Sequence, residues 1–353
     1  MEPEDLQAPG WDAIDKALAA LYADQQPKHF GTLISYELGG PDPLRGISVY
    51  KRLDPVPHWH FVTYGFTELY DKESEDAQTS GWGFELTMRL KTEAEAAEPP
   101  IWTINFLQNL ARYVFNSGNI FANGDYMNAN GPIASGSPTL IRSVVFAHDP
   151  ELPPIATPNG HVEFLQVVGI TDDEELAVKQ WSTLKVLNVF SEHLPLLLTD
   201  LDRGSLLEHR DVRDKLAAGA AAEGANTGYV FVDQLAWSEN RRLLRKPELQ
   251  IALDARQVKE VLGLLPYRLP FGKEFALIGG DAKVVFAPAP QNSYSMEENR
   301  LRLQIQPDVL AEIQSTLAQK EGRYSLSTFK GVVLQVKKTL VKDSNDNVVE
   351  TIG

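Results

Sequence analysis

The stretch from Pro99 to Gly131 constrains the fold of this chain most strongly. Pro99 and Pro100 cannot continue a preceding helix or strand, because proline lacks a backbone N–H and has a fixed φ. Gly118 is the residue type that commonly follows the last turn of a helix. These boundary residues predict a helix between the proline pair and Gly118, followed by a turn and a loop.

The predicted helix has one apolar and one polar side. At about 100° per residue, the apolar arc holds Ile104, Leu107, Leu110, Ala111, Val114 and Phe115. The polar arc holds Asn105, Gln108, Asn109, Arg112 and Asn116. Phe106 and Tyr113 lie on a shared margin, where a tyrosine can bury its ring and offer its hydroxyl. The next segment, Asn123-Gly124-Asp125, predicts a turn back toward the end of this helix.

Size and charge exclude several classes of protein. A chain of 353 residues is longer than a single core normally supports, so we expect two domains. A formal charge of −15 opposes binding to nucleic acid or anionic lipid. The sequence has no apolar run near the roughly 20 residues that span a bilayer, so we expect a soluble, cytoplasmic protein without nucleic-acid or membrane partners. It also has no cysteine, which excludes disulfides and thiolate catalysis.

Alternating and β-branched residues predict strands around this helix. The predicted strands span residues 34–38, 58–65, 84–90, 140–147 and 162–170. Thr171 and Glu174 have the spacing of a capping box, and the apolar residues that follow predict one helix ending near His193. The N-terminal part is therefore a mixed α/β domain.

Several separated motifs in this part resemble the Suppressor of fused family. They are Gly40-Pro41-Asp42-Pro43-Leu44, His58-Trp59-His60, Gly83-Phe84-Glu85-Leu86-Thr87, Leu110-Ala111-Arg112-Tyr113-Val114-Phe115, Gly124-Asp125, Phe164-Leu165-Gln166 and Thr199-Asp200. Their order and spacing agree as well as their residues, over roughly residues 30–206. The resemblance implies that family's two-domain α+β fold.

The C-terminal third predicts a smaller α+β domain with an internal duplication. Two segments about 50 residues apart each suggest a strand, a helix and two further strands, beginning at Leu249 and Leu301. We expect the two to share one sheet. The Ala- and Gly-rich stretch from Ala217 to Gly228 has little to bury, which suggests domains at 1–220 and 221–353.

No catalytic or metal-binding motif stands out. His58 and His60 are the best metal candidates, because alternate residues of one strand share a face. No third ligand has a recognisable spacing, so structural, hydrogen-bonded histidines are the favoured interpretation. We expect no cofactor, no metal and no enzymatic activity.

Two classes of function remain open. Animal Suppressor of fused proteins clamp a short peptide of Gli transcription factors as an added strand between two domains, and the resemblance implies a non-catalytic protein-binding protein with a similar interdomain cleft. That family grips the peptide with the tyrosine and aspartate that correspond to Tyr113 and Asp125. Packing for Tyr113 and turn stabilisation for Asp125 are the structural alternatives. The other class is an enzyme with an unrecognised active site in that cleft.

The partner suggested by the resemblance is a toxin domain. Tyr126 stands where the animal members carry histidine, and the C-terminal part lacks their long polar insertion. This compact form resembles bacterial members, which are inferred to be immunity proteins of polymorphic toxin systems. An acidic protein that neutralises a basic toxin would also fit the charge of −15.

Overall fold

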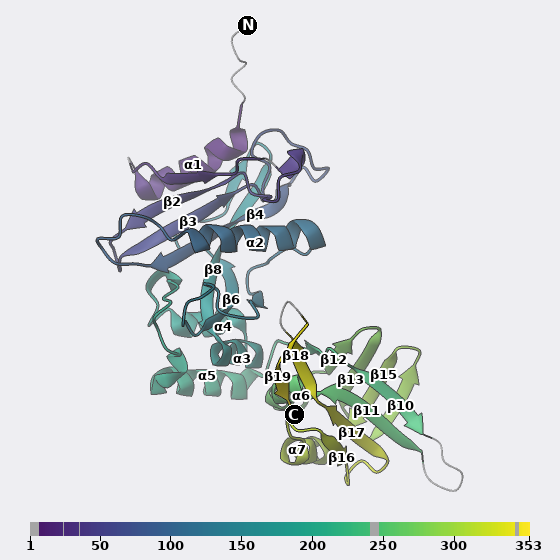
Figure 1. Cartoon of the computed structure of the whole chain (residues 1–353). Helices are drawn as coiled ribbons and strands as arrows, with labels where there is room; N and C mark the ends of the chain where they lie inside the picture. Colours follow the sequence, from purple (N-terminus) through teal and green to yellow (C-terminus); the bar gives the residue numbers. More distant parts are fainter. Residues whose placement is uncertain (1–6, 24, 35, 241–246, 343–345) are drawn as a thin grey trace. The chain divides into compact units, whose positions relative to one another are not determined.

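A computed structural model of the chain describes residues 7–23, 25–34, 36–240, 247–342 and 346–353. Both helices and runs of consecutive strands occur in these ranges (Figure 1), so the expected α+β class is confirmed. The chain divides into two compact units. The first is Met1–Glu175 with Thr183–Arg213, and the second is Leu176–Ser182 with Asp214–Gly353.

The first unit is built on one mixed sheet. Its strand order is β1-β2-β3-β4-β8-β6-β5, and all neighbours are antiparallel except β4 and β8. The bounds are β1 (Lys28–Gly31), β2 (Gly46–Arg52), β3 (His58–Tyr64), β4 (Thr79–Lys91), β5 (Tyr126–Asn128), β6 (Ile141–His148) and β8 (Gly160–Thr171), with β7 (Ile155–Thr157) paired to β8.

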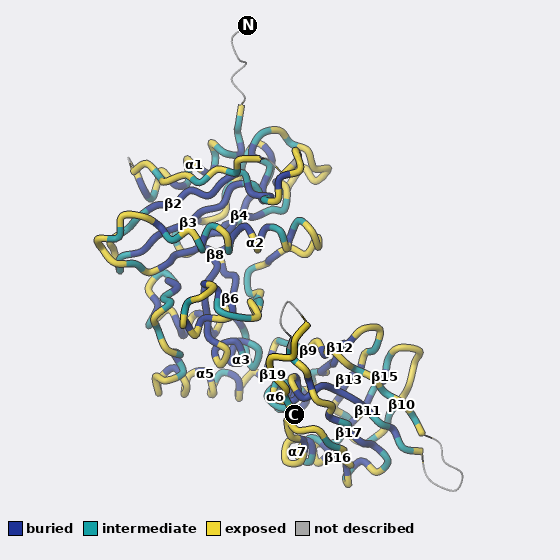
Figure 2. Tube along the Cα trace, in the orientation of Figure 1, coloured by how far each residue is buried: buried dark blue, intermediate teal, exposed yellow. Residues whose placement is uncertain are grey.

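Helices cover both faces of this sheet. On one face, α1 (Pro9–Tyr22) packs its Ile14 and Leu18 with Val62 of β3. On the other, α2 (Ile101–Ser117) packs its Leu107 with Phe61 of the same strand. Successive strand residues point to opposite faces, which is why β3, between the two helices, is buried along its whole length (Figure 2).

The remaining helical segments of the first unit are short. They are η1 (Tyr36–Leu38), α4 (Thr183–Phe190), η2 (Pro195–Leu197) and η3 (Leu206–Glu208). The predicted strand at residues 34–38 is wrong, because Tyr36–Leu38 forms a 3₁₀ turn. Glycines and prolines follow it at Gly39, Gly40, Pro41 and Pro43, and these residue types disfavour strand pairing; Ser35 lies outside the described residues.

The single helix predicted after Thr171 is also wrong. The structure has α3 (Asp172–Gln180) and α4 instead, separated at Trp181 and Ser182. Trp181 donates its indole N–H to Glu223 at 2.8 Å, and the Trp181 ring packs against Gly219. Both partners belong to α5 (Arg210–Glu223). The packing of Trp181 on α5 therefore accompanies the interruption of the helix between α3 and α4.

The second unit contains the two expected strand–helix–strand–strand segments. The first segment is β11 (Glu248–Asp254), α6 (Ala255–Leu264), β12 (Phe275–Gly279) and β13 (Ala282–Pro288), and the second is β15 (Arg300–Ile305), α7 (Pro307–Thr316), β16 (Gly322–Ser325) and β17 (Val332–Lys337). Each is preceded by an antiparallel strand, β10 (Ala236–Asn240) or β14 (Ser293–Glu297).

These segments do not share one sheet, as the sequence had suggested. They build two sheets, β10-β11-β17-β16 and β14-β15-β13-β12-β9, where β9 is Tyr229–Phe231. The first strand of each segment pairs in parallel with the last strand of the other, in β11 with β17 and in β15 with β13. Each sheet therefore needs both segments, and one apolar cluster joins residues of both sheets and both helices.

The unit is completed by smaller elements. These are η4 (Leu265–Tyr267), η5 (Leu269–Phe271) and the hairpin of β18 (Thr339–Lys342) and β19 (Val348–Ile352). The domain boundary expected between residues 220 and 221 lies within α5, and it stays a prediction. None of the helices in the described ranges is long and apolar enough to cross a membrane.

Candidate functional site

The helix α2 presents Tyr113 at its edge, as its sequence indicated. The helix begins after Pro100 and ends at Gly118, whose φ of 72° is in the left-handed region that glycine tolerates. Leu107, Ala111 and Val114 are buried, whereas Tyr113 is 41% exposed. The core contacts therefore fix the helix and leave the Tyr113 side chain at the surface.

Aromatic stacking supports the ring of Tyr113. It stacks on Phe121, with ring centroids 5.7 Å apart, and Phe121 stacks in turn on Phe146 of β6 at 4.0 Å. The Tyr113 hydroxyl accepts a hydrogen bond from Asn119 Nδ2 at 3.3 Å. Its own proton has no acceptor among the described residues, so the hydroxyl can donate to a ligand.

Asp125 lies in the turn that follows this stack. Its Oδ2 accepts a hydrogen bond from the backbone N–H of Ala122 at 2.8 Å, which is the expected turn-stabilising contact. Backbone bonds from Gly124 to Phe146 and from Phe146 to Asp125 fix this turn against β6. Asp125 is exposed, and its Oδ1 has no hydrogen-bond partner within the described part of the chain.

The two predicted site residues therefore belong to one local arrangement. Phe121 stacks on Tyr113, and its chain neighbour Ala122 binds Asp125. β5 starts directly after Asp125 and, within the described ranges, is the last strand of its sheet. A strand with one unpaired side offers backbone N–H and C=O groups to an extended peptide.

The histidines considered for a metal site lie in the core. His58 donates its Nδ1 proton to the carbonyl of Val56 at 2.7 Å, and His60 Nδ1 lies 2.5 Å from the hydroxyl of Tyr22. Burial is the main cause that lowers the pKa of His60 to about 4, and the charge of nearby Arg89 contributes to this shift. Among the described residues, no group of three or more His, Cys, Asp or Glu side chains is arranged to hold a metal.

A buried ion pair next to His60 was missed by the sequence reasoning. Arg89 of β4 and Asp149 both have fully buried side chains, and their Nη1 and Oδ2 atoms are 2.6 Å apart. Asp149 Oδ2 also lies 3.4 Å from His60 Nε2. Burial alone would raise the pKa of Asp149, but His60 and Arg89 together hold it well below its usual range.

This ion pair has structural partners on every side. Asp149 also accepts from the Thr87 hydroxyl at 2.6 Å and from the backbone N–H groups of Glu151 and Leu152. Arg89 donates to Glu151 at 3.0 Å and to the side-chain oxygen of Gln166. Because these charged groups are enclosed and bonded to one another and to neighbouring residues, we interpret them as support for the fold.

Comparison with known proteins adds independent information. The family model described as Suppressor of fused protein (SUFU) matches residues 40–204. The Suppressor of fused homolog of Mus musculus is 34% identical over 277 residues, which is 74% of this chain and 55% of the relative. A chain in the Sufu–Fu complex crystal structure is 31% identical, with a TM-score of 0.56 over 60% of this chain and 98% of that chain.

The chain belongs to the Suppressor of fused family. The crystal structure of Drosophila Suppressor of Fused matches 96% of this chain and 99% of that chain with a TM-score of 0.78 and 23% identity. This likeness shows that the two-unit fold is the Suppressor of fused fold. The chain spans about half the length of the curated Suppressor of fused relatives it matches.

The Suppressor of fused match covers the part of the chain that carries both site candidates. Tyr113 and Asp125 lie inside residues 40–204, in the first unit. Their role in binding stays a prediction, since the geometry is compatible with packing and turn stabilisation as well as with ligand contact.

Proposed function

We propose that this chain is a non-catalytic protein-binding protein that holds an extended segment of a partner at the open edge of β5, with Tyr113 and Asp125 contacting that segment. The single observation that carries the proposal is the edge strand that starts directly after Asp125. The Sufu–Fu complex supports a protein partner, because a chain of it is similar to this one.

The two side chains would divide the contacts. The hydroxyl of Tyr113 donates to a carbonyl of the added segment, and its ring rests on Phe121 so that little rotamer freedom is lost on binding. The free Oδ1 of Asp125 accepts from a backbone N–H or a cationic side chain of the partner.

The partner is a basic protein segment in this proposal. The formal charge of −15 favours encounter with a cationic protein. A toxin domain neutralised by a cytoplasmic, bacterial immunity protein is one such partner, and it is the one that the family resemblance suggests.

The test begins with peptides selected for binding to the whole protein from a random phage library. Tyr113→Phe and Asp125→Asn each keep the shape of the side chain and remove one hydroxyl or one charge. We expect each to weaken the selected peptide by about 1–3 kcal/mol, or one to two decades in affinity, with an unchanged melting temperature. The Asp125 contact should be the more sensitive to salt.

Matched controls separate binding from structure. Tyr229→Phe and Asp281→Asn make the same chemical changes at exposed positions of the second unit and should leave affinity unchanged. Methylating alternate backbone nitrogens of the peptide should abolish binding if it pairs as a strand. Unaltered affinity in both site variants, or full binding of every methylated peptide, would refute the proposal.

A further inference from the structure

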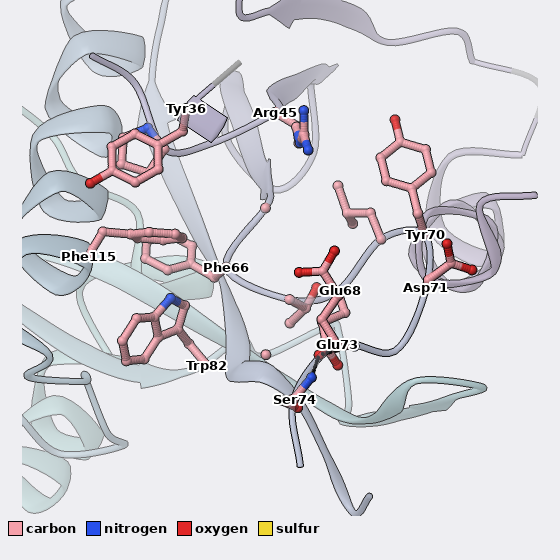
Figure 3. Close-up of a pocket in the computed structure, with 15 residues that line it drawn as sticks. Tyr36, Arg45, Phe66, Glu68, Tyr70, Asp71, Glu73, Ser74, Trp82 and Phe115 are labelled. Carbon is pink, nitrogen blue, oxygen red and sulfur yellow. Dashed lines mark hydrogen bonds between the residues drawn. The ribbon is translucent and has the colours of Figure 1, made fainter. Parts of the chain in front are cut away.

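The first unit has a second surface with the features of a binding site. A cavity of about 380 Å³ lies beside the loop that connects β3 to β4. Figure 3 shows two unlike walls, one formed by the aromatic side chains of Tyr36, Phe66, Trp82 and Phe115 and one by the acidic side chains of Glu68, Asp71 and Glu73. Its volume lies within the range of about 300–1,000 Å³ typical of ligand pockets.

The aromatic wall is held together by ring contacts. Phe115 of α2 packs edge-on against Tyr36 at 5.6 Å and against Trp82 at 5.5 Å. Phe66 packs on Phe84 of the buried core at 4.8 Å. These contacts fix a surface that suits both the methylene groups of a long side chain and, through the ring faces, a cation.

One residue of the acidic wall has a structural task. Glu68 accepts from Lys72 Nζ at 2.8 Å and from the backbone N–H groups of Glu73 and Ser74. Burial would raise its pKa, but these donors outweigh burial and lower the pKa of Glu68 to about 2. Glu68 therefore shapes the loop and is already neutralised by Lys72.

The other two carboxylates remain available. Asp71 and Glu73 are exposed, and neither carboxylate has a hydrogen-bond or ion-pair partner among the described residues. The cavity lining holds three carboxylates against one guanidinium, that of Arg45, which lies 5.8 Å from the centre of the Tyr70 ring. The net charge of the lining is therefore negative and favours a cationic ligand.

The loop that lines the cavity is anchored by hydrogen bonds and a close backbone contact. Buried Glu85 accepts from the backbone N–H of Gly65 at 2.9 Å and of Thr67 at 3.0 Å. Gly81 has a φ of 52°, and a Cβ there would lie 2.6 Å from the carbonyl oxygen of Phe66. The loop is thus fixed on both sides, which lowers the conformational cost of binding.

Apolar side chains lie in the same loop as Tyr36. Leu33 and Leu38 are 102% and 82% exposed, and Ile34 is 56% exposed. Several large apolar side chains left in water within six residues are typical of an interaction surface. A ligand that is part of a protein chain, with an apolar residue near its cationic one, would cover them.

We propose that this cavity binds an arginine or lysine side chain from a partner segment. The methylene stem packs against Trp82 and Phe115, and the charged head lies at Asp71 and Glu73. This site is separate from the edge of β5, because Tyr113 and Phe115 are two residues apart on one helix and point about 200° apart. The proposal for this cavity therefore does not depend on peptide binding at the β5 edge.

The test is a titration of the full chain, labelled with ¹⁵N at its six tryptophans, followed by the indole signals. Trp82→Phe identifies the signal of Trp82. The probes are the capped tetrapeptide Gly-Arg-Leu-Gly and the same peptide with Gln or Glu in place of Arg. We expect the Arg peptide to move the Trp82 signal and to bind roughly fivefold or more tightly than the Gln peptide.

Two double variants make the test specific. Asp71→Asn with Glu73→Gln should weaken the Arg peptide roughly fivefold or more, because it removes both available carboxylates. Glu93→Gln with Glu95→Gln changes the net charge equally at exposed positions outside the cavity and should change affinity less than about twofold.

Three outcomes would overturn the proposal. The first is a Trp82 signal that stays in place up to about 20 mM peptide. The second is an equal response to the Gln or Glu peptide. The third is an equal loss of affinity in both double variants, which would reveal general attraction to an acidic protein.

Discussion

Replacing Asp149 by asparagine should destabilise the first unit strongly, although the side chain keeps its shape. The exchange removes the negative charge that faces Arg89 and places an N–H₂ group where Oδ2 accepted hydrogen bonds from Arg89 and Thr87. The remaining oxygen can still accept from the backbone of Glu151 and Leu152. The main change is therefore that a fully buried guanidinium loses its fully buried counter-charge and keeps only the partly exposed carboxylate of Glu151.

The size of the effect follows from the complete burial of this pair. Removing one partner of a buried ion pair typically costs about 3–5 kcal/mol, because the other charge stays desolvated and uncompensated. A domain has only about 5–15 kcal/mol of stability in total. We expect a similar loss for Arg89→Met, which leaves the Asp149 carboxylate with only its neutral donors.

The double variant distinguishes a coupled pair from two independent sites. Once Arg89 has been replaced by methionine, Asp149→Asn removes a charge that no longer has a counter-charge. We expect the double variant to be at least about 2 kcal/mol more stable than the sum of the single losses predicts.

The assay is urea unfolding followed by tryptophan fluorescence. Trp181 and Trp237 lie in the second unit and are replaced by phenylalanine in every variant, so that the four tryptophans left report on the first unit. An unchanged slope against urea would show that the same transition is compared. Losses below about 1 kcal/mol, or losses that add within about 0.5 kcal/mol, would refute the reasoning.

Two further predictions concern pH and domain organisation. Burial lowers the pKa of His60 from 6.5 to about 4, so the unfolded state takes up this proton at a higher pH than the folded state. The free energy of unfolding therefore decreases as the pH is lowered from 6.5 to about 4. His60→Gln should reduce the loss of unfolding free energy between pH 7 and pH 4 by about 3 kcal/mol, and an unchanged pH slope would contradict this. Limited proteolysis should cut between Ala217 and Lys246 and leave a folded N-terminal fragment. Within this range we expect the cut on the C-terminal side of Glu223, where α5 ends; residues 241–246 lie outside the described residues. Cutting within β4 or β8 instead would count against the expected boundary.

The helix α2 was predictable because its limits depend on local residues. Pro100 and Gly118 set its ends as expected, and the apolar arc at Leu107, Ala111 and Val114 is buried. Gln108 is the exception, since the sequence placed it on the polar side and the structure buries it. Its amide oxygen accepts from the backbone of Leu44 at 3.3 Å, a contact with a loop 64 residues away that no local pattern contains.

The polar side of β4 was not predictable for a related reason. Glu85, Thr87 and Arg89 alternate with apolar residues, which is typical of a strand with one face in solvent. All three are fully buried, because α1 covers that face of the sheet as well. Arg89 then depends on Asp149, 60 residues away, and alternation reveals neither the burial nor the partner.

The two candidate sites differ in how far the sequence could predict their residues. Tyr113 and Asp125 came from the family resemblance, and spacing alone did not connect them. The structure supplies the physical connection, since Phe121 and Ala122 contact one residue each. The cavity at Trp82 had no sequence signal, because its walls come from four separate parts of the chain.

The two proposed surfaces are both carried by α2, and a partner that reaches both should bind more tightly than one that reaches either alone. Tyr113 and Phe115 lie on the same helix, which Leu107, Ala111 and Val114 fix to the sheet, so their separation cannot change without disturbing the core. A partner segment that reaches both surfaces would bind the second one at a high effective concentration, and its affinity would exceed that of either fragment by roughly 10²–10⁴. A short peptide would lack this gain. A double variant at Asp125 and Asp71 should therefore weaken the binding of a long segment. This loss should be far larger than the loss that either single variant causes for a fragment covering only its own surface.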